Sequence, residues 1–262
     1  MAPANGADEE PRRARIVAAG SLADILRRGR EAGWVELEFR ADQSLAHIAE
    51  SLGIPRLEVG AAFVDGAAWS LDFPPPDGSL VELLSVEEPV DLGLEPKFVL
   101  DVHLGRLARH LRLLGFDVLW RNDWSGLDLV LTGMAEERVV LTRDRALLFR
   151  REFRGSPRLA MLLRSKDSLA QLAEVCRRFG LSPFFRPFSL CADCGSALAP
   201  AAVDEVRDRV PPLVAARYTE FFVCPSCGKV YWKGDHFRNI APFLGRLARE
   251  LGMSDIPIEF RN

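Results

Sequence analysis

The pattern of hydrophobic and polar residues changes near residue 90. Before that point, short apolar or alternating runs surround one helix-like segment; after it, apolar runs alternate with stretches of helical period. Period-two alternation predicts half-buried strands, and apolar residues at intervals of three and four predict amphipathic helices. The chain is therefore expected to contain a small α+β part followed by a larger α/β part.

The first part has the order strand, strand, helix, strands. Its expected elements are Ala14–Ala19, Trp34–Phe39, the helix Leu45–Leu52, Val59–Val64 and Leu80–Val86. Asp65-Gly66 is a hairpin signal. The order is similar to the β-grasp, or ubiquitin-like, fold. The segment ends in Val86-Glu87-Glu88-Pro89 and not in the Gly-Gly of conjugated carriers, so we expect a docking module for protein or RNA.

The second part alternates strands with helices, which predicts a parallel sheet with helices on its faces. The expected strands are Lys97–Leu100, Asp117–Trp120, Val139–Thr142 and Leu159–Leu163. The expected helical segments are Leu104–Leu114, Leu127–Glu137, Arg145–Phe153 and Ser168–Phe179. Ligands bind at the carboxyl ends of the strands in such sheets, so candidate chemistry is sought there.

Charge divides the chain at the same place as the hydrophobic pattern. Residues 1–96 carry 8 Lys and Arg against 18 Asp and Glu, a net charge of −10, whereas residues 97–262 carry 26 against 19, a net charge of +7. A linker at 90–96 separates the two parts, so we expect the chain without residues 1–90 to fold. The basic second part favours a polyanionic partner.

Composition excludes several classes of protein. Hydrophobic residues make up 48% of the chain and charged residues 27%, which excludes global disorder. No apolar run approaches the roughly 20 residues that a membrane span needs. The charged start has no apolar stretch typical of a secretory signal, so a cytoplasmic location without membrane contact is expected.

Three acids stand at one edge of the predicted sheet. Asp101 follows the first of the parallel strands, Asp144 follows the third, and Asp128 opens the helix after the second. Three carboxylates without matching lysines favour a site for Mg²⁺ or Mn²⁺, which could activate water for attack on a phosphodiester. The alternative is that each Asp caps the helix behind it.

The helix after Asp101 carries arginines opposite its apolar stripe. These are Arg106, Arg109 and Arg112. Their guanidinium groups could bind an RNA backbone near the acids. The alternative is an ordinary solvated helix face. His103 stands alone beside the acids, and we interpret it as structural.

Four cysteines form two Cys-x-x-Cys knuckles, each followed by glycine. They are Cys191, Cys194, Cys224 and Cys227. This spacing predicts a tetrahedral structural Zn²⁺ without catalytic function; a redox pair is the alternative. The 29 residues between the knuckles leave room for an inserted loop or helix. Cys176 is expected in the core. Tyr231 and Trp232, after the second knuckle, either stack on bases or pack this cysteine-rich segment against its neighbour.

Several motifs occur in the order typical of one nuclease family. They are the Phe98–Asp101 strand, the segments Leu104–Arg109 and Leu111–Asp117, Leu141–Arg145, both knuckles and Val230–His236. Over about 97–240 the chain resembles the mut-seven C-terminal RNase domain family. The resemblance implies a PIN-like nuclease fold with an appended zinc ribbon, a ubiquitin-like N-terminal domain, and acidic roles for Asp101, Asp128 and Asp144. Asp167 stands near the place of a fourth acid.

These expectations combine into one reading of the domains and function. We expect a flexible tail at 1–12, a β-grasp domain at 13–90, a PIN-like domain at 97–185, a zinc ribbon at 186–240 and a C-terminal helix and tail at 241–262. The expected function is metal-dependent cleavage of single-stranded RNA. The alternatives are an idle RNA- or ribosome-binding adaptor, or the toxin of a toxin–antitoxin pair. The β-grasp domain would contact a protein partner.

Overall fold

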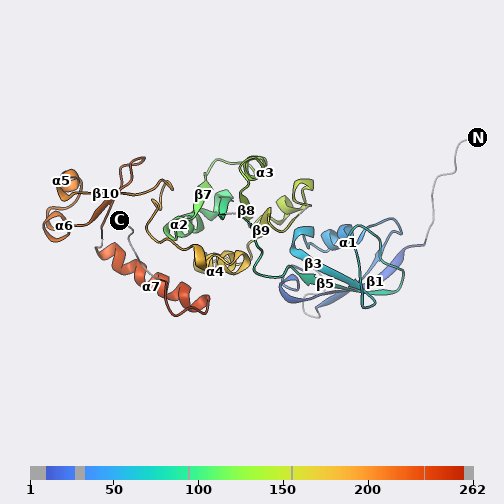
Figure 1. The fold of residues 1–262 in the computed structure, drawn as a ribbon. Helices are drawn as coiled ribbons and strands as arrows, with labels where there is room; N and C mark the ends of the chain where they lie inside the picture. The colour runs from blue at the N-terminus through green and yellow to red at the C-terminus, as the bar shows by residue number, and fades with distance from the viewer. Residues whose placement is uncertain (1–9, 27–32, 94, 155, 233, 257–262) are drawn as a thin grey trace, which may run out of the picture. The chain divides into compact units, whose positions relative to one another are not determined.

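The computed structural model describes residues 10–26, 33–93, 95–154, 156–232 and 234–256 (Figure 1). The first nine residues of the expected tail and residues 257–262 lie outside the described part. The chain forms two compact units, Met1–Glu87 with Asp144–Leu162, and Glu88–Arg143 with Leu163–Asn262. No helix of the described residues is long and apolar enough to cross a membrane.

The first unit contains a five-stranded mixed sheet of order β2-β1-β5-β3-β4. Its strands are β1 (Arg12–Ala18), β2 (Trp34–Phe39), β3 (Val59–Val64), β4 (Ala67–Ala68) and β5 (Ser79–Ser85). β1 and β5 are parallel at its centre, and the other neighbours are antiparallel. Helix α1 (Leu45–Ser51) begins where the Ser44 side chain accepts the His47 amide. This arrangement confirms the predicted ubiquitin-like fold.

Residues 144–162 belong to the same unit. They form two short 3₁₀ segments, Arg145–Phe149 and Arg151–Phe153, and strand β9 (Ala160–Leu162). The single helical segment expected at 145–153 is therefore wrong. Leu147, Leu148 and Phe153 are all buried, but one α-helix would place Phe153 opposite the two leucines. The break at Arg150, whose backbone is extended, lets all three be buried.

Hydrogen bonds join residues 144–162 to the ubiquitin-like part of this unit. The Glu58 side chain is 1% exposed and accepts the Leu162 amide at 3.0 Å. The Arg145 guanidinium donates to the Ile25 carbonyl at 2.9 Å. The first compact unit therefore consists of two separate stretches of the chain. The linker at 90–96 does not indicate the second stretch.

The second unit is built on the parallel strands β6 (Lys97–Leu100), β7 (Asp117–Trp120) and β8 (Val139–Thr142), with β6 between the other two. Its helices are α2 (Gly105–Leu113), α3 (Gly126–Ala135) and α4 (Ser168–Phe179). Gly133 lets α3 approach the sheet, since a Cβ there would lie 2.6 Å from a Val140 methyl. The predicted parallel α/β fold is confirmed.

The cysteine-rich segment forms an antiparallel sheet of β10 (Ala199–Ala201), β11 (Phe221–Val223) and β12 (Val230–Trp232). Two short helices, α5 (Val203–Val206) and α6 (Pro212–Arg217), lie between the knuckles in sequence. Val206, Val210 and Phe221 form a small core, against which Trp232 packs. Helix α7 (Asp235–Glu250) begins directly after Gly234, not at 241 as expected, because no connecting segment separates it from the ribbon.

Candidate active site

Asp101 is buried at the carboxyl end of β6. It is 6% exposed, and both its carboxylate oxygens accept hydrogen bonds. Oδ1 accepts the His103 amide at 2.8 Å; Oδ2 accepts the Thr142 hydroxyl at 2.7 Å and the Arg143 amide at 3.1 Å. The side chain therefore links the ends of β6 and β8. A carboxylate has about four lone-pair sites, so these three bonds leave one for another ligand.

The other predicted acids are exposed and cap short or long helices. Asp128 accepts the amide and hydroxyl of Ser125 in a capping box, and these bonds hold the pKa of Asp128 below its ordinary value. Asp144 accepts the Ala146 amide at 2.9 Å. Asp167 accepts the Ala170 and Leu169 amides, which lower the pKa of its carboxyl. Each acid thus has the capping role given as the alternative.

Within the described residues, the cysteines form the one group of three or more His, Cys, Asp or Glu side chains able to hold a metal ion. The three acids do not meet that condition. Carboxylate oxygens are nonetheless the donors that Mg²⁺ and Mn²⁺ take, and Asp101 retains one lone-pair site, so the residue types fit such an ion.

A cavity of about 560 Å³ opens in the second unit beside Asp101. We call it the Arg106 cavity; its wall includes His103, Arg106, Trp120, Arg143, Lys166 and Asp193. Residues from the start of α2, the end of β7, the turn after β8 and the start of α4 meet there. Apart from Asp193, the charged residues of this wall are cationic, so the cavity suits an anion.

The three predicted RNA-binding arginines differ in their surroundings. Arg106 is exposed and lines the cavity. Arg109 is exposed but pairs with Asp193 at 2.6 Å. Arg112 is 4% exposed, and its guanidinium donates to the carbonyls of Val118 and Asp193. These contacts argue against the prediction that Arg112 binds RNA, because backbone carbonyls accept three of the five hydrogen bonds that its guanidinium can donate.

The two knuckles repeat one backbone pattern. The amide of Gly195 donates to the Cys191 carbonyl at 2.8 Å, and that of Gly228 to the Cys224 carbonyl at 2.9 Å. Both glycines have positive φ, +83° and +77°, which only glycine adopts without strain. This turn brings the two cysteines of each knuckle to one side.

The four cysteine sulfurs lie within 4.8 Å of one another. Cys191 Sγ is 3.6 Å from Cys227 Sγ, and Cys194 Sγ is 3.3 Å from Cys224 Sγ. Four Zn–S bonds of about 2.3 Å in a tetrahedron place the sulfurs about 3.8 Å apart. The donor set and its spacing fit zinc, and residues 191–227 carry no fifth ligand in this group.

The surroundings of Cys194 and Cys227 shift the pKa values of these two thiols in opposite directions. Burial opposes ionisation of Cys194, but hydrogen bonds from Ser196 and the neighbouring thiols lower its pKa to about 6. The Lys229 amide favours the Cys227 thiolate, but burial and the other thiols raise the pKa of Cys227 to about 12. Proximity of the sulfurs thus favours the thiolate of Cys194 and disfavours that of Cys227, a conflict that a cation relieves.

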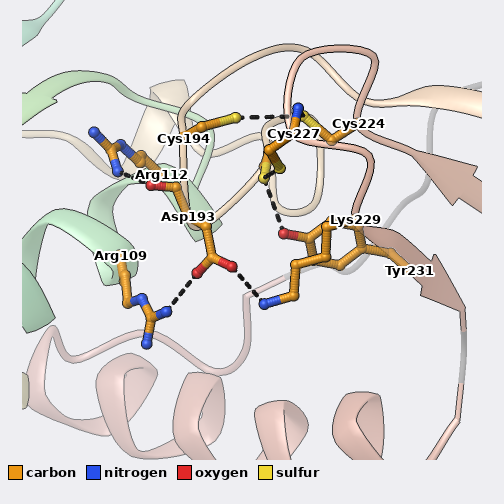
Figure 2. Close-up of polar contacts among 9 residues, drawn as sticks. Arg109, Arg112, Asp193, Cys194, Cys224, Cys227, Lys229 and Tyr231 are labelled. Atoms are coloured by element: carbon orange, nitrogen blue, oxygen red, sulfur yellow. Dashed lines mark hydrogen bonds and ion pairs between the residues drawn. The ribbon is translucent and has the colours of Figure 1, made fainter.

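Asp193 of the first knuckle forms ion pairs with residues of α2 and of the second knuckle, as Figure 2 shows. Its carboxylate pairs with Lys229 of the second knuckle and with Arg109 of α2. The hydrogen bond from Lys229, followed by the charge of Arg109, lowers the pKa of Asp193 against the effect of burial. Its carbonyl also accepts from Arg112. One residue therefore joins both knuckles and α2.

The aromatic residues after the second knuckle are half-buried. The Tyr231 hydroxyl contacts Cys191 Sγ at 3.1 Å, while Trp232 packs against the ribbon core. These contacts favour packing over base stacking. Cys176 is 3% exposed, and burial raises the pKa of its thiol, so its predicted place in the core is confirmed.

Two protein-family models match the chain. The model described as Mut7-C RNAse domain matches residues 96–244, more than half of the chain. The chain belongs to the Mut7-C RNAse domain family. A second model, described as Mut7-C ubiquitin, matches residues 12–91. The resemblance stated from the motifs is confirmed. Neither the curated proteins nor the solved structures contain a significant match.

Within this Mut7-C RNAse domain, sequence reasoning missed four residues of the site. Asp193 is one of them, and its place between the two cysteines of the first knuckle was the available signal. Trp120, Arg143 and Lys166 were overlooked, although each stands at or just beyond the carboxyl end of a predicted strand. That position was the available signal, because strand ends converge at one edge of a parallel sheet.

Proposed function

We propose that the chain is a metal-dependent ribonuclease that cuts single-stranded RNA, with Asp101, Asp128 and Asp144 as its acids. The observation that carries the proposal is the buried carboxylate of Asp101 beside a cationic cavity. Burial of a charged group is costly, and a carboxylate held at the carboxyl end of a central strand is typical of a functional site. The family match supports the nuclease class.

Mg²⁺ or Mn²⁺, when bound, supplies an activated water and stabilises charge on the phosphate oxygens. Asp101 would hold the ion through its remaining lone-pair site. The chain's own cations hold the strand: Arg106 lies on the cavity wall, and Arg109 is exposed beside it. The hydrogen bonds from Thr142 and Arg143 fix the orientation of the Asp101 carboxylate.

The test is hydrolysis of a labelled single-stranded RNA with added Mg²⁺ or Mn²⁺, comparing the native chain with Asp144→Asn. Asn also caps a helix, so this change removes charge and preserves the bond to the Ala146 amide. We expect loss of cutting by at least about a hundredfold, the scale of removing one charge-stabilising group. Asp255→Asn, at another exposed carboxylate, is the matched control and should cut normally.

Asp101→Asn is less suited to this comparison. Its amide nitrogen would face at least one backbone N–H where the carboxylate now accepts a bond. A buried donor facing another donor costs about 1–3 kcal/mol, so loss of activity would mix with loss of stability. Cutting that survives Asp144→Asn would show that the activity comes from a contaminating nuclease or from other residues.

A second candidate function is an RNA-binding adaptor without hydrolysis. It is favoured by the capping bonds, because Asp128, Asp144 and Asp167 each have a structural role without any ion. In this case the ribbon and the ubiquitin-like domain would make the partner contacts. A pure preparation that binds RNA but cuts none with either cation would establish the adaptor.

A further inference from the structure

Three cations of the Arg106 cavity have no partner in the described part of the chain. The side chains of Arg106, Arg143 and Lys166 are exposed, and make neither an ion pair nor a hydrogen bond with described residues. They come from α2, the turn after β8 and the residues before α4. Three like charges on one cavity wall repel one another unless an anion lies among them.

The cavity also has a fixed aromatic wall. The Trp120 indole nitrogen donates to the Asp101 carbonyl at 3.1 Å. Gly105 makes room for the ring, because a Cβ there would lie 2.8 Å from Trp120 Cζ2. The ring is half-buried, lines the cavity and is held by two independent contacts. An immobilised indole beside cations provides a stacking surface for a nucleobase.

The cavity and Asp101 share their supporting residues. His103 and Arg143 line the cavity, and their amides donate to the Asp101 carboxylate. Trp120 donates to the carbonyl of the same residue. A ligand in the cavity therefore contacts residues that hold in place the acid that we propose for hydrolysis. The volume of about 560 Å³ falls within the usual range of about 300–1,000 Å³ for small-ligand sites.

We propose that the Arg106 cavity is a nucleotide subsite for single-stranded RNA. Arg106, Arg143 and Lys166 bind neighbouring backbone phosphates, and Trp120 stacks on a base attached to them. The proposal rests on the proposed function for its choice of RNA. Binding itself requires no hydrolysis and can be tested separately. A duplex does not satisfy the geometry, because its bases are stacked on one another and cannot reach an aromatic wall.

The first experiment measures binding of a short fluorescein-labelled oligouridylate by anisotropy, without added Mg²⁺ or Mn²⁺, as a function of salt. Each phosphate contact with a single strand contributes about 0.7 to the slope of log affinity against log salt. The triple variant R106A/R143A/K166A should therefore lose about 2 from that slope. The control R151A/R154A/R249A removes the same charge from exposed arginines elsewhere and should keep the slope.

The second experiment tests stacking. Trp120→Leu should weaken binding at least about fivefold without changing the salt slope, and Trp120→Phe should restore most of the affinity. Zinc content and thermal melting of each variant confirm that the chain is folded. Uridine 5′-monophosphate should compete far less well than the strand, since it offers one phosphate without neighbours.

The outcomes separate this proposal from the proposed function. If the triple variant binds like its control, the cavity is not the subsite, even if the chain cuts RNA. If the mononucleotide competes as well as the strand, the site takes a free nucleotide and the assignment to RNA is wrong. If binding follows the predictions but no cation supports cutting, the subsite is established and the hydrolytic function is not.

Discussion

Arg112 and Arg109 both contact Asp193, but in different dielectric surroundings. The Arg112 guanidinium is buried and donates to two carbonyl oxygens, so its removal leaves acceptors without partners. Arg109 keeps 61% of its side chain exposed, where water competes with the carboxylate. Exposed ion pairs contribute about 0–1 kcal/mol, whereas an unsatisfied buried polar group costs about 1–3 kcal/mol. The buried arginine should therefore dominate stability.

We expect Arg112→Ala to lower the free energy of unfolding by about 2–4 kcal/mol, from lost hydrogen bonds and lost packing. Arg109→Ala should lower it by at most about 1 kcal/mol. Urea denaturation of the zinc-loaded chain measures both, with Arg249→Ala as an exposed control. Equal effects of the two substitutions would contradict the different roles assigned to them.

His110 gives the second unit a dependence on pH. Burial, the largest influence, lowers the pKa of its imidazole below the ordinary value, although the Ser168 backbone and Asp167 oppose this. The unfolded chain therefore binds more protons than the folded chain as pH falls through about 6.5, and stability decreases there. Its ring also packs on Phe243, with centroids 4.4 Å apart.

We expect the chain to be less stable at pH 5.5 than at pH 7.5, and His110→Phe to reduce that difference by removing the buried titrating group. Urea denaturation of both proteins at the two pH values measures the change. Protonation of the zinc ligands affects both proteins equally, so it cancels in the comparison. An unchanged difference in His110→Phe would exclude His110 as its cause.

Residue roles were predictable where the partners are near in sequence. A capping role for Asp144 and Asp167 follows from helical segments that begin directly after them, and one for Asp128 follows from its place in the first turn of α3. The burial of Arg112 did not follow, since its partner Asp193 is 81 residues away. The expectation placed Arg112 opposite the apolar stripe with Arg106 and Arg109, but only the tertiary contacts decide which way a long side chain points.

At the scale of elements, we expect the fold of the knuckles to depend on metal binding more than on packing. The buried core of the ribbon consists of Val206, Val210 and Phe221, and so few apolar side chains supply little of the free energy that ordering the loops costs. Four thiolates around a zinc ion would supply the remainder, since metal binding and folding are coupled in such modules.

We expect one tightly bound zinc per chain by elemental analysis, and loss of zinc with unfolding of residues 189–235 in Cys194→Ser or Cys227→Ser. Cys176→Ala is the matched control, because that thiol lies in the core of another element and should leave zinc bound. Limited proteolysis locates the unfolded segment. A full complement of zinc in Cys194→Ser would contradict the four-cysteine site.

Elements with a single dominant signal were predictable to the residue. Strict alternation of apolar and polar residues predicted β2, and short continuous apolar runs predicted β6 and β8. An Asp cap with a closing glycine predicted α4. The segment 145–153 was not predictable in this way. Its leucines and Phe153 cannot share one helix face, and only the surrounding core shows that all of them are buried.

At the scale of the whole molecule, the change of hydrophobic pattern near residue 90 predicted where the α+β part ends and the α/β part begins. The membership of residues 144–162 in the first compact unit was not predictable. It rests on bonds between residues about a hundred positions apart, Leu162 to Glu58 and Arg145 to Ile25, and local pattern contains no information about such pairs.

These bonds change the expected result of deleting residues 1–90. A chain starting at 91 would lose the Glu58 carboxylate that accepts the Leu162 amide, and the Ile25 carbonyl that accepts from Arg145. Leu147, Leu148 and Phe153, now buried, would lose part of their apolar surroundings. The linker argument alone predicts an intact remainder, whereas the contacts predict that residues 144–162 lose their order in it.

We expect hydrogen exchange at residues 144–162 to become at least about tenfold faster in the truncated chain, because lost protection reflects local opening. Exchange at the knuckles, residues 191–227, should change little, since the predicted zinc would hold them independently of the ubiquitin-like domain. The full-length variant Glu58→Ala should give a smaller change in the same direction, and Glu58→Gln, which keeps an acceptor, a smaller one still. Equal protection of residues 144–162 in both chains would show that this segment folds without the ubiquitin-like domain.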